Sequence, residues 1–349
     1  MEKEVTQEIL EKYKNITPAT VWTALGKKGY ENCVMDNVKP LTKGKIILGR
    51  ARTLRYLPER PDLKEEVREG YSADGMEVPN ENAPEYRAMG SCGPGDVLVC
   101  DAMGNSTAAN LGDVKLVQLK MNKAEGIVTD GGMRDFDQVE PFGFSIYASG
   151  RTPKAARHVM TEYEDNVDIQ CDGVLVRPGD IIYGNDDGVV VVPKHLAEEI
   201  VEWCELYESA EEYIKNKAEK ERVPPGKYYP PTKEWLENFK KNMIKFFLLN
   251  PSSDKSSDKS SLEVSSPAAT SCNSSFTSAF APKYDSLIVS HFVLKESASD
   301  HSISSASLAN FSFAVSARSL ATSLIISLRV FSALSLFNST FFSICSLSF

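Results

Sequence analysis

The chain has 349 residues, of which 42% are hydrophobic and 25% are charged, as in an ordinary globular protein. Its 39 lysines and arginines stand against 48 aspartates and glutamates, which gives a formal net charge of −9. This balance excludes a protein that binds nucleic acid through a basic surface, because neutralising phosphates needs an excess of lysine and arginine. We therefore expect a soluble protein of the cytoplasm that handles a small ligand or a metal ion.

The composition changes near residue 250, and the chain divides into three predicted parts. Residues 251–349 contain 31 serines, no glycine and no tryptophan, whereas all 21 glycines lie before them. We expect a main domain over 1–222, a proline-rich linker with a C-terminal helix over 223–250, and a serine-rich, low-complexity, disordered tail over 251–349.

Two other interpretations of the tail remain open. Residues 320–349 are mostly apolar and carry Arg329 as their one charge, which is the pattern of a membrane segment, but their many serines weaken it and we expect no membrane contact. The Leu/Phe/Ser-rich composition is also that of a Lys/Glu/Ala-rich coding strand read in antisense.

Cysteine spacing and the N-terminus both favour an intracellular protein. Seven cysteines are scattered without a CxxC pair, which predicts free thiols rather than a zinc site or a disulfide framework. The N-terminal residues, Met1-Glu-Lys-Glu-Val, are charged and lack the apolar segment of a secretory signal.

The first third of the chain predicts two helices and a strand. Residues 4–14 place apolar side chains at helical spacing, and Thr17-Pro18 is typical of a helix start, with a helix that runs to about Gly29. Residues 45–56 resemble a strand of mixed exposure, and the polar, proline-bounded stretch 58–80 predicts a surface excursion.

The middle of the chain alternates strands with a helix. Short apolar strands are predicted over 97–100, 126–129 and 144–147. Between the first two, residues 111–124 show helical spacing at Val114, Val117 and Met121. A strand–helix–strand order with short turns indicates an α/β fold.

The pattern then changes to short strands separated by turns. Residues 167–193 contain Pro-Gly-Asp and Asn-Asp-Asp-Gly turns, which predict antiparallel hairpins. Two helices follow, a long acidic one over 194–222 and an amphipathic one over 232–247.

Polar side chains gather where two neighbouring strands are predicted to end. Asp101 follows the first strand, Asp113 begins the helix, and Asp130, Arg134 and Asp135 follow the second strand. Because a right-handed crossover makes these strands neighbours, their carboxyl ends place the five residues at one crevice. The free amides of the helix start bind anions, and Arg134 can hold a carboxylate in bidentate fashion.

Asp135 can hold a divalent cation, since a single carboxylate with several waters is the usual coordination of Mg²⁺ in proteins. The alternative interpretation is a solvated Arg-Asp pair beside a plain Gly-Gly turn. His158 and His195 stand alone and are not predicted to be catalytic bases. No GxSxG, HExxH, Walker or GxGxxG pattern is present.

The residues around Arg134 resemble a known family. Asp130-Gly-Gly-Met-Arg-Asp135 resembles its DGxxRD signature, and Gly112, Gly95–Val99 and Pro178–Pro193 match its other motifs in the same order. The chain is therefore similar, over roughly residues 16–215, to the RraA-like family of the regulator of ribonuclease activity A and the class II 4-hydroxy-4-methyl-2-oxoglutarate aldolases.

This resemblance implies a fold and an assembly. The expected fold is an α/β, swivelling β/β/α domain followed by C-terminal helices and the low-complexity tail. The expected assembly is a homotrimer or a dimer of trimers with sites at subunit interfaces. A neighbouring subunit's C-terminal helix usually completes such a site with an acid, for which Glu208, Glu211 and Glu212 are the candidates.

The resemblance also implies roles for single residues. Asp135 would hold the cofactor, a Mg²⁺ or Mn²⁺ ion, and Arg134 would bind the pyruvyl group and stabilise the enolate. Gly112 and the amides of Val114 and Lys115 would bind the substrate, and Asp113 would position a water or a base. Lys115 replaces a usual apolar residue and is expected to add charge at the substrate pocket.

The implied reaction is the retro-aldol cleavage of a 4-hydroxy-2-oxo acid to pyruvate and a second keto acid, with oxaloacetate decarboxylation as a side activity. Gln138 stands where the family often has an acid, and the 58–80 excursion lies ahead of the site. These departures affect the choice of substrate more than the metal. The alternative function is that of a non-catalytic acidic oligomer that binds and inhibits a ribonuclease or a helicase.

Overall fold

The structure is a computed structural model that describes residues 4–67 and 80–249. The predictions for the tail, 251–349, lie outside the described residues, as does the second half of the 58–80 excursion. The chain separates into two compact units, of which the first ends at Glu208 and the second begins at Ser209.

The helices confirm most of the predicted ones. They are α1 (Gln7–Tyr13), α2 (Pro18–Lys27), α3 (Pro61–Val67), α4 (Pro84–Gly90), α5 (Asp113–Asn122), α6 (Phe136–Val139), α7 (Ala197–Glu221) and α8 (Lys233–Leu249), with short 3-10 turns η1 (Glu140–Phe142), η2 (Ala156–His158), η3 (Lys194–Leu196) and η4 (Pro225–Lys227). The predicted start of the second helix is correct in detail, because the Thr17 side chain accepts a hydrogen bond from Thr20 N and Pro18 opens the first turn.

Strands from the whole first unit form one mixed sheet and a separate hairpin. They are β1 (Val34–Met35), β2 (Lys39–Pro40), β3 (Ile47–Pro58), β4 (Asp96–Asp101), β5 (Ala109–Leu111), β6 (Gly126–Met133), β7 (Ser145–Arg151), β8 (Met160–Asp165), β9 (Ile169–Cys171), β10 (Val174–Val176), β11 (Ile181–Asn185) and β12 (Gly188–Val192). The sheet order is β1-β12-β11-β3-β4-β6-β7-β2, with β5 on β6 and β8 on β3, while β9 and β10 pair with each other.

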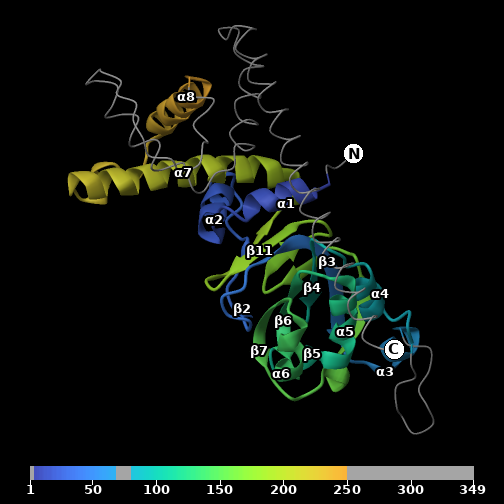
Figure 1. Ribbon diagram of the computed structural model, residues 1–349. Coiled ribbons are helices and arrows are strands. Elements are labelled where there is room, and N and C mark those ends of the chain that lie inside the picture. Colours follow the sequence, from blue (N-terminus) through green and yellow to red (C-terminus); the bar gives the residue numbers. More distant parts are fainter. Residues whose placement is uncertain (1–3, 68–79, 250–349) are drawn as a thin grey trace, which may run out of the picture. The chain divides into compact units, whose positions relative to one another are not determined.

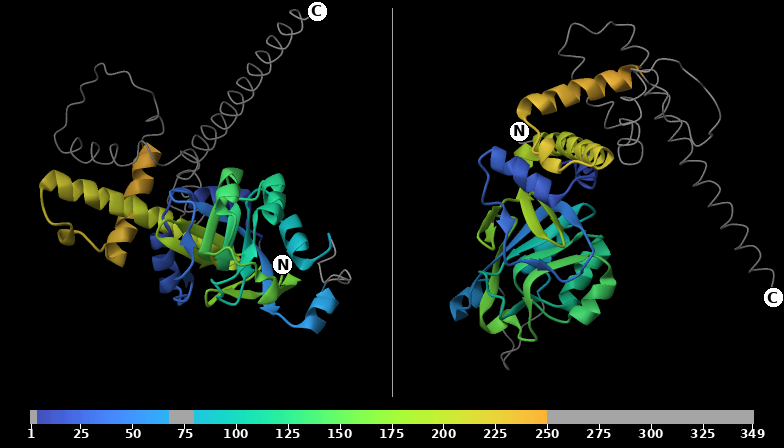
Figure 2. Two further views of the ribbon diagram at one scale, coloured as in Figure 1. Left: turned by 90° about the horizontal axis from the view of Figure 1, so that it is seen from below. Right: turned by 90° about the vertical axis from the view of Figure 1, so that its left-hand side faces the viewer.

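Alternating side chains of the strands separate the layers of the first unit. Leu98 and Cys100 of β4 pack with α4, α5 and α6, whereas Val97 and Val99 of the same strand pack toward the β9–β10 hairpin. Figures 1 and 2 show α4 and α5 along one side of the strands. Helices α1, α2 and the first part of α7 instead cover β11 and β12. This arrangement is the predicted swivelling β/β/α fold.

Parallel and antiparallel pairing divide the sheet as the sequence predicted. Strands β3, β4, β6 and β7 pair in parallel, and β11 and β12 form an antiparallel hairpin joined antiparallel to β3. Strand β8 was not predicted, because its residues, Met-Thr-Glu-Tyr-Glu-Asp, alternate too weakly between apolar and polar to indicate a strand.

The residues whose helical spacing predicted α5 do not form its buried face. Val114, Val117 and Met121 are 79%, 38% and 67% exposed, whereas Leu116 and Leu119 are the buried residues of the helix. Both sets have helical spacing, so the sequence pattern could not decide between the two faces. The exposed set forms an apolar stripe, hereafter the α5 stripe.

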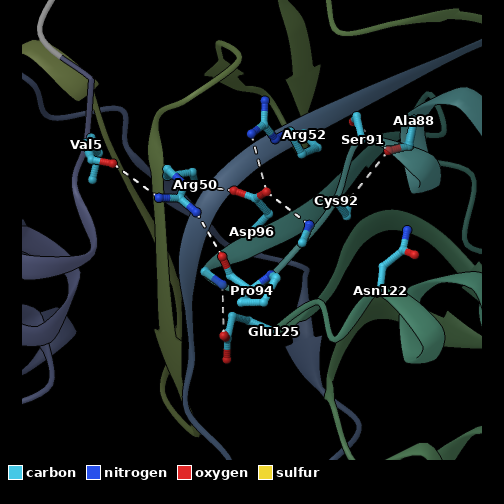
Figure 3. Close-up of polar contacts among 12 residues, drawn as sticks. Val5, Arg50, Arg52, Ala88, Ser91, Cys92, Pro94, Asp96, Asn122 and Glu125 are labelled. Carbon is cyan, nitrogen blue, oxygen red and sulfur yellow. Dashed lines mark hydrogen bonds and ion pairs between the residues drawn. The ribbon is translucent and has the colours of Figure 1, made fainter.

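Two Pro-Gly-Asp turns flank β3 and are built alike. In the first, buried Asp96 accepts hydrogen bonds from Gly93 N (3.0 Å) and Arg50 Nε (2.7 Å) and forms an ion pair with Arg52 (3.3 Å). Figure 3 shows the two arginines on either side of the Asp96 carboxylate. In the second, Asp180 accepts from Arg177 N and Lys194 N, both at 2.9 Å. Each turn therefore uses its aspartate to bind neighbouring backbone amides, and Asp96 binds two arginine side chains as well.

The second unit contains an aromatic cluster between its helices. Tyr213 lies against Trp235 and Phe239 of α8, and the rings of Trp235 and Phe239 are stacked with their centroids 5.2 Å apart. Among the helices of residues 4–67 and 80–249, none combines the length and apolar character needed to cross a membrane.

Candidate functional site

The site begins where β5 pairs with the second half of β6. Ala109 lies opposite Gly132 and Leu111 opposite Met133, so the residue after each strand lies next to its counterpart. These residues are Gly112, which caps α5, and Arg134, which follows β6. A short parallel pairing, which the sequence did not predict, therefore sets the geometry of the site.

Gly112, Arg134 and Asp135 are packed together. Arg134 Nε lies 3.1 Å from Asp135 Oδ2, and the two side chains are 39% and 40% exposed. A Cβ atom on Gly112 would lie 2.7 Å from Arg134 Nε and 2.8 Å from Asp135 Oδ2. Only a residue without a side chain fits at position 112 unless both charged groups move.

Asp135 is held by the backbone at a helix start. Its φ of 55° and ψ of 30° are left-handed, and it caps α6. Aspartate is among the residues that tolerate this conformation. The turn directs the carboxylate back toward Gly112 instead of onward along α6.

Helix α5 supplies unpaired backbone donors beside this pair. Its first internal hydrogen bond runs from Leu116 N to Gly112 O, so the amides of Asp113, Val114 and Lys115 have no acceptor within the helix. The positive end of the helix dipole lies at the same place. An anionic ligand near Arg134 would therefore meet both a guanidinium and backbone donors.

The Lys115 side chain is engaged elsewhere. Its Nζ lies 2.6 Å from Oε2 of Glu85 on α4, and the Glu85 side chain is 2% exposed. The positive charge of Lys115, which was expected to add to the substrate pocket, is thus matched by a buried carboxylate. Sequence reasoning missed Glu85, because it lies in a polar stretch with no motif and its role depends on α4 packing against α5.

Asp101 and Asp130 do not join the Arg134 cluster, which corrects the five-residue crevice. Strand β6 continues through Asp130 to Met133, so the predicted end of the strand at residue 129 is wrong. Asp130 is fully buried and accepts hydrogen bonds from Ala102 N (2.6 Å), Gly104 N (3.0 Å) and Asp172 N (3.1 Å). It therefore acts as a structural cap of the loop after β4.

Asp101 lies beside it in a separate cavity of about 490 Å³ that both aspartates line. Its Oδ1 accepts from Met103 N at 3.0 Å and from Gln170 Nε2 at 2.5 Å, and burial raises the pKa of its carboxyl.

The three candidate acids of α7 differ in their surroundings. Glu208 is 8% exposed, and its Oε1 accepts a hydrogen bond from Thr17 N at 2.7 Å within the same unit. Glu212 accepts from Asn216 Nδ2 at 3.3 Å. Glu208 is therefore already engaged at the start of α2 within its own unit, and Glu212 also lies 4.0 Å from Lys215.

A metal ion at this site would depend mainly on Asp135. Within residues 4–67 and 80–249, no group of three or more histidine, cysteine, aspartate or glutamate side chains forms a closed metal site. A half-exposed carboxylate fits Mg²⁺ or Mn²⁺ that keeps most of its waters, and it does not fit a zinc site, which needs three or four protein ligands.

Comparisons with known proteins agree with the motif resemblance. A family model described as RraA-like, Aldolase/RraA, matches residues 18–191. A Halalkalibacterium halodurans protein provisionally named 4-hydroxy-4-methyl-2-oxoglutarate aldolase is 34% identical over 167 residues, which cover 48% of this chain and 69% of that protein. A protein of the same provisional name from Alcanivorax borkumensis is 31% identical over 117 residues, 33% of this chain and 72% of that protein.

Solved structures share the fold. The crystal structure of Streptomyces coelicolor RraAS2, described as an unusual member of the RNase ES inhibitor RraA protein family, is 28% identical with a TM-score of 0.52 and covers 61% of this chain and 98% of its own. A Pseudomonas syringae protein is 23% identical with a TM-score of 0.51, covers 64% of this chain and 98% of its own, and supports the fold alone.

Proposed function

Since the chain belongs to the RraA-like family, we propose that it is a class II aldolase, a divalent-metal-dependent lyase that cleaves 4-hydroxy-2-oxo acids of the 4-hydroxy-4-methyl-2-oxoglutarate type. The products are pyruvate and a second keto acid, and oxaloacetate decarboxylation is the side activity. One observation carries the proposal: Arg134, Asp135 and the start of α5 meet at Gly112, where a Cβ would lie less than 3 Å from both side chains.

The pyruvyl part of the substrate would bind between Arg134 and the start of α5. Its carboxylate and 2-oxo oxygens are acceptors, and the guanidinium and the amides of Val114 and Lys115 are donors. These donors are held by β6 and α5 before the substrate arrives. Such preorganisation favours the transition state, in which negative charge grows on the 2-oxo oxygen.

The bond changes follow from this placement. A base, for which Asp113 is the candidate, takes the proton of the C4 hydroxyl directly or through a water. The C4–O bond becomes a carbonyl, the C3–C4 bond breaks, and its electron pair passes into the enolate of pyruvate. Arg134 stabilises the enolate oxygen, and protonation at C3 gives pyruvate. In oxaloacetate, loss of CO₂ leaves the same enolate.

The divalent ion, held by Asp135, would supply additional positive charge for the 2-oxo oxygen. Arg134 and Asp135 neutralise each other in the absence of a ligand. Cation and substrate together would replace this internal pair, so we expect each to strengthen the binding of the other.

We also propose a homotrimer or a dimer of trimers, in which a neighbouring subunit covers the site. Arg134 and Asp135 are more exposed than catalytic groups in a closed site usually are. The α5 stripe begins at Val114, inside the site, and large exposed apolar side chains that follow one helix face favour a protein contact. Glu211 or Glu212 of the neighbour would then supply the last acid.

The test is pyruvate release from 4-hydroxy-4-methyl-2-oxoglutarate and from oxaloacetate, with Mg²⁺ or Mn²⁺ and with EDTA. We expect turnover that EDTA abolishes and that Asp135→Ala loses. Asp137→Ala is the matched control, since Asp137 is an exposed aspartate two residues away that pairs with Arg151. Equal turnover in Asp135→Ala and the parent protein would contradict the proposal.

The second candidate function is inhibition of a ribonuclease or a helicase without turnover. It is favoured by the likeness to RraAS2, which is described as belonging to an RNase ES inhibitor family. Inhibition by docking does not require Arg134 and Asp135. This alternative would be supported if the parent chain had no aldolase activity and the Asp135→Ala variant inhibited such an enzyme as well as the parent chain does.

A further inference from the structure

A second cavity lies at the opposite end of α5 from the candidate active site. Its volume is about 520 Å³, within the range of small-molecule sites. It is bounded by the loop before β3, the C-terminal end of α5, and the segment that joins η1 to β7. We call it the amino-edge cavity, because it lies at the amino ends of the parallel strands. Since α5 has ten residues and rises about 1.5 Å per residue, this cavity is about 15 Å from Gly112.

The charges of the amino-edge cavity are mainly positive, although the whole chain carries −9. Lys45, Lys120 and Lys123 line it, together with one acid, Glu125. In the described part of the chain, none of the three lysines forms an ion pair with a carboxylate. Lys45 Nζ instead donates a hydrogen bond to Gly143 O at 2.9 Å. Glu125 Oε1 accepts from Gly95 N at 3.0 Å and is turned toward the neighbouring turn.

The remaining walls are apolar and aromatic. Phe142 and Phe144 contact edge to face with their centroids 6.1 Å apart, and Lys120 Nζ lies 4.8 Å from the centroid of Phe142. Ile46, at the rim, is 52% exposed. A cation held over an aromatic ring beside an exposed aliphatic side chain suits a ligand with both a flat ring and a negative group.

We propose that the amino-edge cavity binds a small aromatic anion, in which a planar ring packs on Phe142 and Ile46 and an anionic group pairs with Lys120 and Lys123. Two classes of ligand combine a planar ring with an anionic group in this way, namely a mononucleotide and a fused-ring aryl carboxylate. The proposal is independent of the aldolase reaction, because none of these residues belongs to the site at Gly112.

Isothermal titration calorimetry on the full chain tests the proposal, with adenosine monophosphate and 1-naphthoate as probes. Two control probes each carry one of the two features: inorganic phosphate has the negative charge without a ring, and 1-naphthalenemethanol has the ring without a charge. We expect at least one ring-bearing anion to bind about tenfold or more tighter than either partial probe. Binding of that anion should weaken as salt rises, because the lysines are exposed.

Two substitutions locate the binding. The double variant Lys120→Gln with Lys123→Asn removes both charges. Asparagine is chosen for position 123 because it tolerates the positive φ of 58° there. This variant should bind the anion about tenfold more weakly. Lys39→Gln with Lys43→Gln is the matched control, since both are exposed lysines that do not line the cavity, and it should bind within about twofold of the parent chain.

Phe142→Leu keeps every charge and should remove the preference for the ring-bearing anion over phosphate. Thermal unfolding of each variant checks that it is folded. Preference for adenosine monophosphate over naphthoate would assign a nucleotide, and the reverse an aryl carboxylate. The proposal is overturned if neither anion binds better than its parts, or if the Lys120/Lys123 and Lys39/Lys43 variants lose affinity equally.

Discussion

The ammonium of Lys115 lies 2.6 Å from the carboxylate of Glu85, which is almost fully buried beneath the first turn of α5. The backbone amide of the same lysine is one of the free donors at the candidate site. One residue therefore serves the site through its backbone and ties α5 to α4 through its side chain. The start of α5, where we propose that the substrate binds, is held in place by an ion pair that has no part in the proposed chemistry.

Removing this lysine should destabilise the chain. Lys115→Met leaves the Glu85 carboxylate buried without its lysine, and breaking such a pair costs about 2–3 kcal/mol after allowance for the 28% exposure of Lys115. Urea unfolding measures the loss. The double variant Glu85→Gln with Lys115→Met should recover part of it, and additive losses in this cycle would show that the two side chains are not coupled.

Gly112→Ala should reduce turnover with little effect on folding. The added Cβ would lie within 3 Å of Arg134 Nε and Asp135 Oδ2, both at the ends of half-exposed side chains that can move. The backbone at Gly112 has a φ of −139°, which alanine adopts without strain. We expect kcat/KM to fall about tenfold or more.

Gly150→Ala is the control for this change, because a Cβ there meets Ser106 at an ordinary 3.5 Å. Its steady-state kinetics should match those of the parent chain. An active Gly112→Ala enzyme would mean that Arg134 and Asp135 need not stay where they are.

Arg134→Lys should not rescue catalysis. Lysine keeps the positive charge but loses the planar fork that can hold a carboxylate and an enolate oxygen together. Loss of one preorganised donor of this kind costs about 10²–10³ in kcat. Steady-state pyruvate release measures the effect. A lysine variant with nearly full kcat would limit the role of Arg134 to general electrostatic attraction.

Asp96→Asn should lower stability without altering the site. Asp96 is 4% exposed and bonds to Arg50, Arg52 and Gly93, so the neutral amide would leave two arginines near a group that no longer balances them. We expect a loss of about 3 kcal/mol in the free energy of unfolding, measured in urea at pH 7. Activity per folded molecule should be unchanged, because Asp96 lies at the amino end of β4 and the site at the carboxyl ends.

Glu205 predicts a dependence of stability on pH. Burial raises the pKa of its carboxyl from 4.5 to about 7, partly offset by Lys12 and increased by Glu202. The folded state therefore holds this proton more tightly than the unfolded state. Its contribution to stability is complete below pH 4.5 and is lost as pH rises toward 7.

The loss at pH 8 is at most about 3–4 kcal/mol, from about 2.5 pKa units at 1.36 kcal/mol each. Glu205→Gln should therefore be more stable than the parent chain at pH 8 and nearly equal to it at pH 4. Denaturant unfolding at both values checks this. A variant that is equally destabilised at both would mean that the carboxylate is charged and favourably paired in the folded chain.

Local signals in the sequence predicted many elements correctly. Thr17-Pro18 announces α2 through capping chemistry that acts within one turn, and the strand at 97–100 is recognisable because all its residues are apolar. Residue types and their order likewise identified Arg134 and Asp135, and the resemblance to the RraA-like family added Gly112. The structure brings these three residues together. Their functional roles remain a proposal.

Features that depend on which surfaces pack against each other could not be predicted from the sequence. Two faces of α5 had helical spacing, and only packing against the sheet showed that Leu116 and Leu119 are buried while Val114 and Met121 are exposed. Asp130 resembled the end of a strand, but pairing of β5 with β6 extends the strand through it.

The sequence by itself thus determined the alternation of strands and helices, the acidic character and the motif of the candidate site, because these depend on neighbours along the chain. The tertiary structure decided that Glu85 holds Lys115, that Asp130 is structural, and that Gly112 touches both charged residues. Each of these contacts joins residues at least 20 positions apart, so its energy depends on a distance that chain order does not contain.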